Sequence, residues 1–94
     1  MGNSSTYNKK GKQFISEYKY LEAIQSFDRA IKNNPNDSDN WTLRGFSKYW
    51  SEQYEDAITD LDKAIELEPN VSLSWRYRGG CKYCLKQYED AITD

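Results

Sequence analysis

The chain has 94 residues, enough for one small domain. Thirteen basic and fifteen acidic side chains give a net charge of −2, which argues against nucleic acid as the main partner. The sequence shows no apolar run that could span a bilayer and no secretory signal, so it predicts a cytoplasmic protein. Because the chain has no His and no nucleophile beside a base, we expect no enzymatic activity, no cofactor and no catalytic residue.

Periodic apolar residues predict helices along almost the whole chain, separated by short polar turns. Pro35 and Pro69 cannot continue a helix, so they end the second and the fourth. A Ser or Thr among residues 4–6, then Ser38 and Ser72, are placed to cap the first, third and fifth. The expected spans are about 4–18, 20–33, 38–51, 55–68 and 72–86, followed by the first two turns of a sixth helix at 88–94.

The fourth predicted helix shows most clearly which side chains should face the core. Its apolar residues step by three and four and share one face: Tyr54, Ala57, Ile58, Leu61, Ala64 and Ile65. Its charged residues fall mostly between these positions, and we expect them to face water: Asp56, Asp60, Asp62, Lys63 and Glu66.

Many positions recur at an interval of 34 residues. Trp75 follows Trp41 at this interval, and the heptapeptide YEDAITD at 54–60 returns unchanged at 88–94. Gly45, inside a predicted helix, has counterparts at the same interval in both directions. Since a Gly inside a helix costs roughly 1 kcal/mol relative to Ala, its recurrence indicates that two helices approach closely there.

A helix–turn–helix unit with Trp and Gly on the first helix, Tyr and two Ala on the second, and Pro at the end resembles the tetratricopeptide repeat. The resemblance implies an all-α, right-handed αα-superhelix with two full repeats and a third that is truncated in its second helix. We expect a single domain, 1–94, with repeats at about 4–37, 38–71 and 72–94. Where the family usually has Leu before the Gly, this chain has Lys10, Arg44 and Arg78.

The resemblance also implies that the first helices line a concave groove that holds a peptide of a partner protein. We therefore expect a non-enzymatic protein-binding adaptor. The groove positions carried over are Asn8, Lys12, Ile15, Thr42, Phe46, Tyr49, Trp50, Arg76 and Tyr83.

Among these positions, Trp50 is the favoured binding anchor. The matching residues are Ser16 and Cys84, so the repeat does not require Trp there. Trp41 and Trp75, in contrast, recur at one position and are expected to pack between helices.

One subclass of the family holds acidic chaperone tails with a clamp of Lys, Asn and Arg. This chain keeps only one Lys and one Asn of that set, in exchanged places, so we do not expect chaperone-tail binding. The residues at the clamp positions are Asn8, Lys12, Leu43, Leu73 and Tyr77.

The alternative hypothesis is a structural repeat unit that stacks head to tail with copies of itself. The incomplete third repeat should leave an apolar edge, which favours weak self-association. This edge comprises Leu85, Tyr88, Ala91 and Ile92. Residues 1–6 also fit the N-myristoylation pattern, so we expect contact with a membrane only if Gly2 is acylated.

Cys81 and Cys84 form a C-x-x-C pair inside a predicted helix. A structural zinc site needs four ligands, and the chain has no other Cys and no His, so we expect no metal. Cys81 is interpreted instead as a small buried residue and Cys84 as a residue on the groove side.

Overall fold

The structure, a computed structural model, describes residues 3–93 and holds within that range five α-helices and no strand. The predicted all-α class is confirmed. None of the described helices is long and apolar enough to cross a membrane. Gly2, the residue of the acylation hypothesis, lies outside the described range. The helices are α1 (Ser4–Ser16), α2 (Tyr20–Asn33), α3 (Ser38–Trp50), α4 (Tyr54–Leu67) and α5 (Ser72–Thr93).

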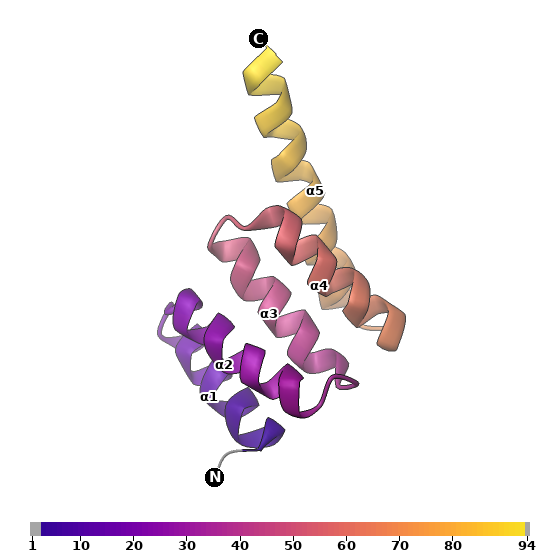
Figure 1. Ribbon diagram of the computed structural model, residues 1–94. Coiled ribbons are helices and arrows are strands. Elements are labelled where there is room, and N and C mark those ends of the chain that lie inside the picture. The colour runs from indigo at the N-terminus through magenta and orange to yellow at the C-terminus, as the bar shows by residue number, and fades with distance from the viewer. Residues whose placement is uncertain (1–2, 94) are drawn as a thin grey trace.

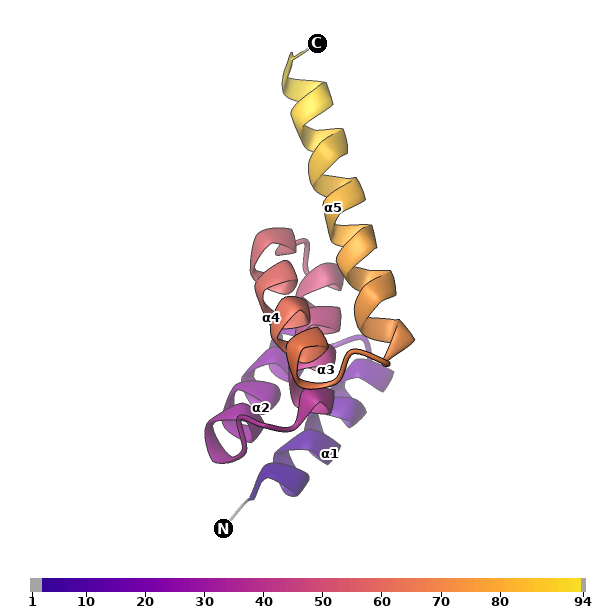
Figure 2. The same cartoon turned by 90° about the vertical axis from the view of Figure 1, so that its right-hand side faces the viewer.

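The helices form two successive antiparallel pairs, α1 with α2 and α3 with α4, and the first half of α5 packs against the second pair (Figure 1). Seen from the side, α2 and α4 lie on one side of the molecule and α1 and α5 on the other, with α3 between them (Figure 2). The second half of α5 extends beyond the other helices.

Two helix starts differ by one residue from the expected caps. Asn3, rather than one of residues 4–6, caps α1, because its side-chain oxygen accepts a hydrogen bond from the Thr6 N–H at 3.0 Å. Asp37, rather than Ser38, caps α3 by accepting from the Asp39 N–H at 3.0 Å. In both cases the capping side chain lies immediately before the first helical residue, where it satisfies a free backbone donor.

The turns that join α1 to α2 and α3 to α4 share one backbone conformation. Tyr18 has φ 61° and Glu52 has φ 63°, and each lies two residues before the next helix. The matching position in the third repeat is Lys86, which is helical, so α5 continues without a turn. The separate sixth helix that we expected at 88–94 is therefore wrong, because α5 runs on to Thr93.

The predicted close approach at the recurring Gly residues is confirmed in the two complete helix pairs. A Cβ at Gly11 would lie 2.5 Å from Phe27 Cζ, and a Cβ at Gly45 would lie 2.7 Å from Leu61 Cγ. A Cβ at Gly79 would meet no atom of another described helix within 4 Å. The buried apolar core consists of Ala23, Phe27, Ala30, Ile31, Ala57, Leu61, Ala64 and Cys81.

Candidate functional site

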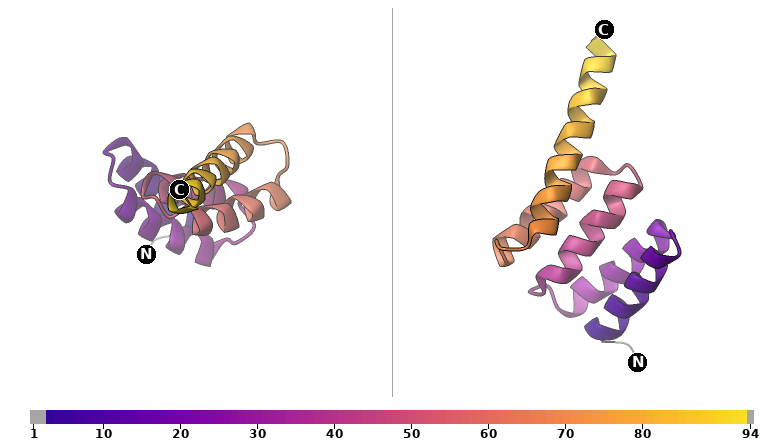
Figure 3. Two further views of the ribbon diagram at one scale, coloured as in Figure 1. Left: turned by 90° about the horizontal axis from the view of Figure 1, so that it is seen from above. Right: turned by 180° about the vertical axis from the view of Figure 1, so that it is seen from behind.

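The helices α1, α3 and α5 lie next to one another, and the view from behind shows them side by side (Figure 3, right). The side of the molecule that they form is here called the α1/α3/α5 face. All nine sequence-predicted groove residues belong to these three helices. Their surroundings differ along the face: a polar end on α1, an aromatic middle on α3 and an exposed part on α5.

The polar end of the face is tied together by hydrogen bonds between α1 and α3. The Asn8 side-chain amide donates to Asp39 Oδ2 at 3.0 Å and to Asn40 Oδ1 at 2.7 Å. Lys12 Nζ lies 3.3 Å from the same Asp39 carboxylate. The fully buried Asn40 in turn donates to Ser4 Oγ at 3.1 Å. Asn8 and Lys12, two of the predicted groove residues, are therefore already bound by side chains of α3.

The aromatic middle of the face centres on Phe46 and Trp50. Phe46 contacts Tyr77 of α5 edge-to-face, with ring centroids 4.8 Å apart. Trp50 stacks on Tyr20 at 6.2 Å and meets Tyr49 edge-on at 5.2 Å. Even so, 49% of Trp50 remains exposed to solvent. The structure thus brings together three predicted residues, Phe46, Tyr49 and Trp50, and leaves one of them available to a ligand.

Tyr20 belongs to this cluster although sequence reasoning did not place it in the site. It is the first residue of α2, and it contacts both Phe46 and Trp50 of the next helix pair. Its signal in the sequence was the recurrence of Tyr at positions 20, 54 and 88. A residue that recurs in every repeat is expected to serve the fold, so the recurrence gave no indication that Tyr20 also contacts Trp50.

The remaining predicted residues divide into buried and exposed ones. Thr42 is buried, and its hydroxyl shares a 2.8 Å hydrogen bond with that of Ser74, so it joins α3 to α5 and does not line an open surface. Ile15 is half-buried and Arg76 is exposed. Tyr83 is 64% exposed and its hydroxyl accepts from the Gln87 amide at 2.9 Å.

The two cysteines lie beside the aromatic middle without forming a disulfide. Cys81 is buried in the cluster of Ala57 and Leu61, and burial raises the pKa of its thiol to about 11. Burial also raises the pKa of Tyr49, and the neighbouring Cys84 thiol adds to the effect. Residues 3–93 contain no group of three potential ligands that could hold a metal ion.

We expected Trp41 and Trp75 to pack between helices, and they do not. Each indole N–H instead donates to the carbonyl of the proline before its helix, Trp41 to Pro35 and Trp75 to Pro69, both at 2.8 Å. The guanidinium groups of the following arginines cover the rings, at 5.1 Å for Arg44 and 4.5 Å for Arg78. The Trp of each repeat therefore fixes the loop between two helix pairs.

Asp60, expected to face water, is only 2% exposed. Arg44 donates two hydrogen bonds to its carboxylate at 2.8 and 2.7 Å, and Lys48 Nζ lies 3.0 Å away. Arg44 also donates to Asp28 at 2.8 Å. Burial lowers the pKa of Arg44, but the bonds and charges of the two aspartates offset this and the net shift is upward. We call Asp28, Arg44, Lys48 and Asp60 the ionic cluster.

Comparison with known proteins identifies the repeat. Residues 40–71 match the family model described as "Tetratricopeptide repeat". These residues form a tetratricopeptide repeat. No curated protein sequence matches the chain.

Solved structures share the tetratricopeptide-repeat fold over nearly the whole chain. One described as "Second TPR of Spaghetti (RPAP3) bound to HSP90 peptide SRMEEVD" superposes with a TM-score of 0.87 at 24% identity, covering 97% of this chain and 84% of that one. The first TPR domain of human RPAP3 superposes with a TM-score of 0.83 at 22% sequence identity, covering 94% of this chain and 69% of that one. The "TPR2AB-domain:pHSP90-complex of yeast Sti1" superposes with a TM-score of 0.86 at 22% sequence identity, covering 96% of this chain but only 35% of that one.

Proposed function

We propose that the chain is a non-enzymatic adaptor whose α1/α3/α5 face holds a peptide segment of a partner protein. The observation that carries this proposal is the half-exposed Trp50 in the middle of the face, with the exposed Tyr83 on the next helix. Large exposed aromatic side chains supply most of the affinity in many protein interfaces. Solved domains of the same fold hold a peptide, the HSP90 segment SRMEEVD.

The site that we propose consists of the aromatic middle with exposed side chains at its edges. Thr42 is left out because it is buried. Asn8 and Lys12 stay at the polar border, where they are held by Asp39. The binding residues are Ile15, Phe46, Tyr49, Trp50, Arg76 and Tyr83.

The chemistry of this face favours an apolar or aromatic peptide over an acidic tail. The cation nearest the polar end, Lys12, is already paired with Asp39, whose own negative charge opposes a second carboxylate. The other positions of the chaperone-tail clamp carry Leu43, Leu73 and Tyr77, which offer no positive charge. We therefore propose that the chain binds SRMEEVD weakly, in contrast to its structural relatives.

Peptide selection followed by matched Trp variants would test the proposal. Peptides would be selected from a random displayed library on the whole chain, and Kd would be measured by fluorescence anisotropy. Trp50→Ala should weaken binding by about 2 kcal/mol, or roughly 30-fold in Kd. Trp75→Ala is the control, because Trp75 is similarly exposed, at 46%, but is bonded to the Pro69 loop.

Two outcomes would count against this function. One is a set of selected peptides that bind Trp50→Ala and Tyr83→Ala as tightly as the parent. The other is tight binding of SRMEEVD that is insensitive to both changes. Tyr83→Ala is included because Tyr83 is 64% exposed, so its loss should disturb folding little even if Trp50→Ala does.

A second candidate function, self-assembly, is favoured by the free half of α5. Tyr88 is 54% exposed although its ring contacts that of Tyr54 on α4, and Ile92 is 83% exposed. We infer the division into repeats at about 4–37, 38–71 and 72–94 from the pairing of the helices, which makes this half-helix the incomplete part. Sedimentation over a concentration series would show association if this edge pairs with another copy. An Ile92→Lys variant should remain monomeric.

A further inference from the structure

At both junctions between successive helix pairs, the arginine just before the recurring Gly forms an ion pair with an aspartate of the preceding helix pair. Arg44 on α3 donates to Asp28 on α2 at 2.8 Å, and Arg78 on α5 donates to Asp62 on α4 at 2.9 Å. Each acid lies 16 residues before its cation. The two junctions therefore follow one rule: the second helix of a pair presents an aspartate to the first helix of the next.

The helices that present these acids also share their flanking residues. Ile24 and Ile31 lie four residues before and three residues after Asp28, and Ile58 and Ile65 lie in the same places around Asp62. Ile31 is buried, and Ile58 packs against the core cluster that includes Cys81 of α5. Helical spacing puts both isoleucines on the same side as the aspartate. The common unit is an Ile-x-x-x-Asp-x-x-Ile helix.

At the N-terminal end of the chain, the cation in the matching position has no such partner. Lys10 occupies the place of Arg44, and within residues 3–93 its amine makes no ion pair or hydrogen bond. Inside the second pair Asp60 holds Arg44, but the corresponding residue of the first pair is Ser26, which has no charge. The Lys10 charge is therefore not satisfied from within its own helix pair.

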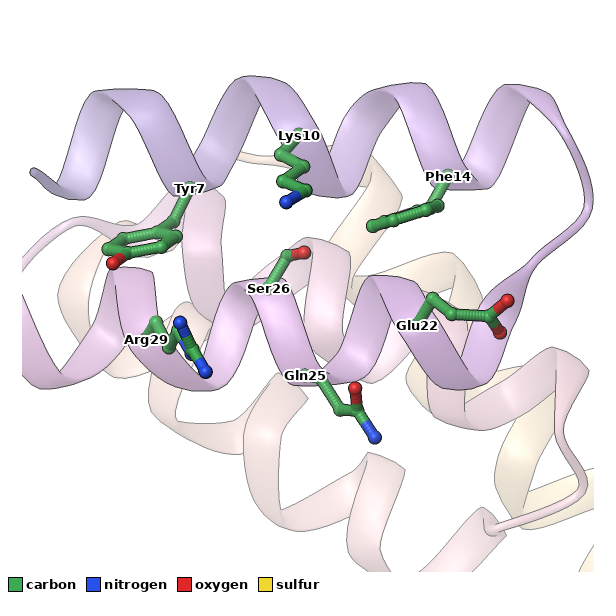
Figure 4. A pocket seen from close by; sticks show the side chains of 7 residues that line it. All are labelled: Tyr7, Lys10, Phe14, Glu22, Gln25, Ser26 and Arg29. Carbon is green, nitrogen blue, oxygen red and sulfur yellow. The ribbon is translucent and has the colours of Figure 1, made fainter. Parts of the chain in front are cut away.

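The structure forms a hollow of about 190 Å³ around Lys10, between α1 and α2 (Figure 4). Lys10 points into it toward Ser26, with Tyr7 on one side and Phe14 on the other. The Arg29 guanidinium, 5.7 Å from the Tyr7 ring centroid, adds a second cation. The one acid of the lining, Glu22, points away from Lys10 toward the turn that joins α1 to α2 (Figure 4).

The length of the hollow fits a helix. Tyr7 and Phe14 are seven residues apart on α1, which corresponds to about 10 Å along the axis. Ile24 and Ile31, the isoleucines of the internal unit, are separated by the same seven residues. Two aromatic walls with a cation between them therefore match two aliphatic side chains with an acid between them.

We propose that this N-terminal face is a docking site for an amphipathic helix of a partner protein. The partner helix places an aspartate or glutamate on Lys10, as α2 and α4 place theirs on Arg44 and Arg78, and packs aliphatic residues against Tyr7 and Phe14. This site is formed by α1 and α2 alone and takes a helix. The α1/α3/α5 face, in contrast, is proposed to hold a peptide segment through Trp50. The two proposals stand independently.

A peptide with the sequence of α4 is a suitable probe, because it carries the complete Ile-x-x-x-Asp-x-x-Ile unit. A lactam bridge on its outer face should hold it helical, since free peptides of this length are marginal helices. Binding of the labelled peptide to the whole chain would be measured by fluorescence anisotropy, and its position by amide shifts in α1. The matched control peptide has Asn at the position of Asp62.

We expect Lys10→Ala and the Asn control peptide each to weaken binding at least five-fold. Lys9→Ala should leave it unchanged, because Lys9 is also an exposed lysine of α1 but does not line the hollow. Lys10→Glu should abolish binding of the parent peptide and restore it for a peptide with Lys in place of Asp62. Rescue by charge reversal would not follow from a structural effect of Lys10 alone.

Three results would overturn the proposal. Equal binding to the parent chain and to Lys10→Glu would place the peptide elsewhere, for example along the free half of α5. Self-association of the chain that Lys10→Glu removes would identify a second copy, not a partner helix, as the occupant. Shifts confined to the Trp50 region would assign the peptide to the α1/α3/α5 face and likewise reject the N-terminal site.

Discussion

Leu61 packs directly on the backbone of Gly45: a Cβ at Gly45 would lie 2.7 Å from Leu61 Cγ and 3.3 Å from the Ala57 carbonyl oxygen. Such distances are too short for non-bonded carbon atoms, so α3 and α4 approach as closely as they do only because this residue is Gly. The same position on α5, Gly79, has open space around it. This difference yields the first prediction.

Gly45→Ala should destabilise the protein, and Gly79→Ala should not. The first change forces Leu61 or α4 to move, and overpacking of a core costs about 1–3 kcal/mol, partly offset by the roughly 1 kcal/mol gain in helix propensity. Gly79→Ala brings the propensity gain alone. Urea denaturation of the two variants should therefore shift the midpoint in opposite directions. Equal shifts would mean that α3 and α4 are not in close contact at Gly45.

Asp60→Ala should cost about 3–5 kcal/mol of unfolding free energy, because it leaves the largely buried Lys48 without a carboxylate and Arg44 with Asp28 alone. Ser26→Ala, the same position in the first helix pair, should cost less than about 1 kcal/mol. Thermal unfolding followed by circular dichroism would compare the two. Similar melting temperatures for both variants would show that the ionic cluster contributes little to stability.

Alkaline pH should weaken the fold through Cys81. Burial raises the pKa of this thiol from an ordinary value of about 9 to about 11. Between these values the unfolded thiol has lost its proton while the folded one keeps it, so stability falls as the pH rises from 9 to 11. The full effect is about 2–3 kcal/mol.

Denaturant titrations at several pH values would measure this dependence. Between pH 9 and 10, Cys81→Ala should remove most of the loss, whereas Cys84→Ala should keep most of it, because burial is the larger cause of the Cys81 shift and the Cys84 thiol the smaller. Tyr54, whose pKa burial raises from about 10 to about 12, adds a loss between pH 10 and 12 that both variants share, and Tyr49 contributes to it in the same direction. A Cys81→Ala protein with the parent's pH dependence would contradict the assignment.

The repeated heptapeptide predicts a large contrast in hydrogen exchange. Ala57 is fully buried between α3 and α4, whereas the same residue of the second copy, Ala91, lies in the free half of α5. Opening of the free half exposes little apolar surface, so its amides should exchange at least 100-fold faster. Amide exchange followed by NMR would resolve both residues. Comparable protection at Ala91 in dilute solution would indicate that something covers this half-helix.

The regular features of the fold could be predicted from the sequence because they are local or recur. The interval of 34 residues gave α1 to α4 within a few residues and identified the close contacts at Gly11 and Gly45. The sequence could not show that α5 continues through Lys86 without the turn that we expected there. Neither Tyr18 nor Glu52 is a residue that prefers positive φ, so these turns depend on the packing of the helix that follows, and at Lys86 that packing is absent.

The individual surroundings of the site residues were less accessible to sequence reasoning. Asp60 has the charge and spacing of a surface residue, and it is buried only because Arg44 and Lys48 from α3 reach it. Thr42 was carried over with its neighbours, yet its hydroxyl faces Ser74 across a helix junction. Phe46 and Trp50 were placed on the correct helix, but their contact with Tyr20 joins residues that only the folded chain brings together.

The left-handed backbone at Tyr18 and Glu52 points to where this protein can be made more robust. A side chain with a Cβ costs about 1 kcal/mol or more in that conformation, a cost from which Gly is exempt. Both residues are exposed, so Tyr18→Gly and Glu52→Gly would remove little buried surface. Glu52→Gly should thus raise the melting temperature while leaving the binding faces untouched, which would give a more tolerant starting point for engineering either face, whereas Tyr18→Gly would also remove the edge-on contact of Tyr18 with Tyr20.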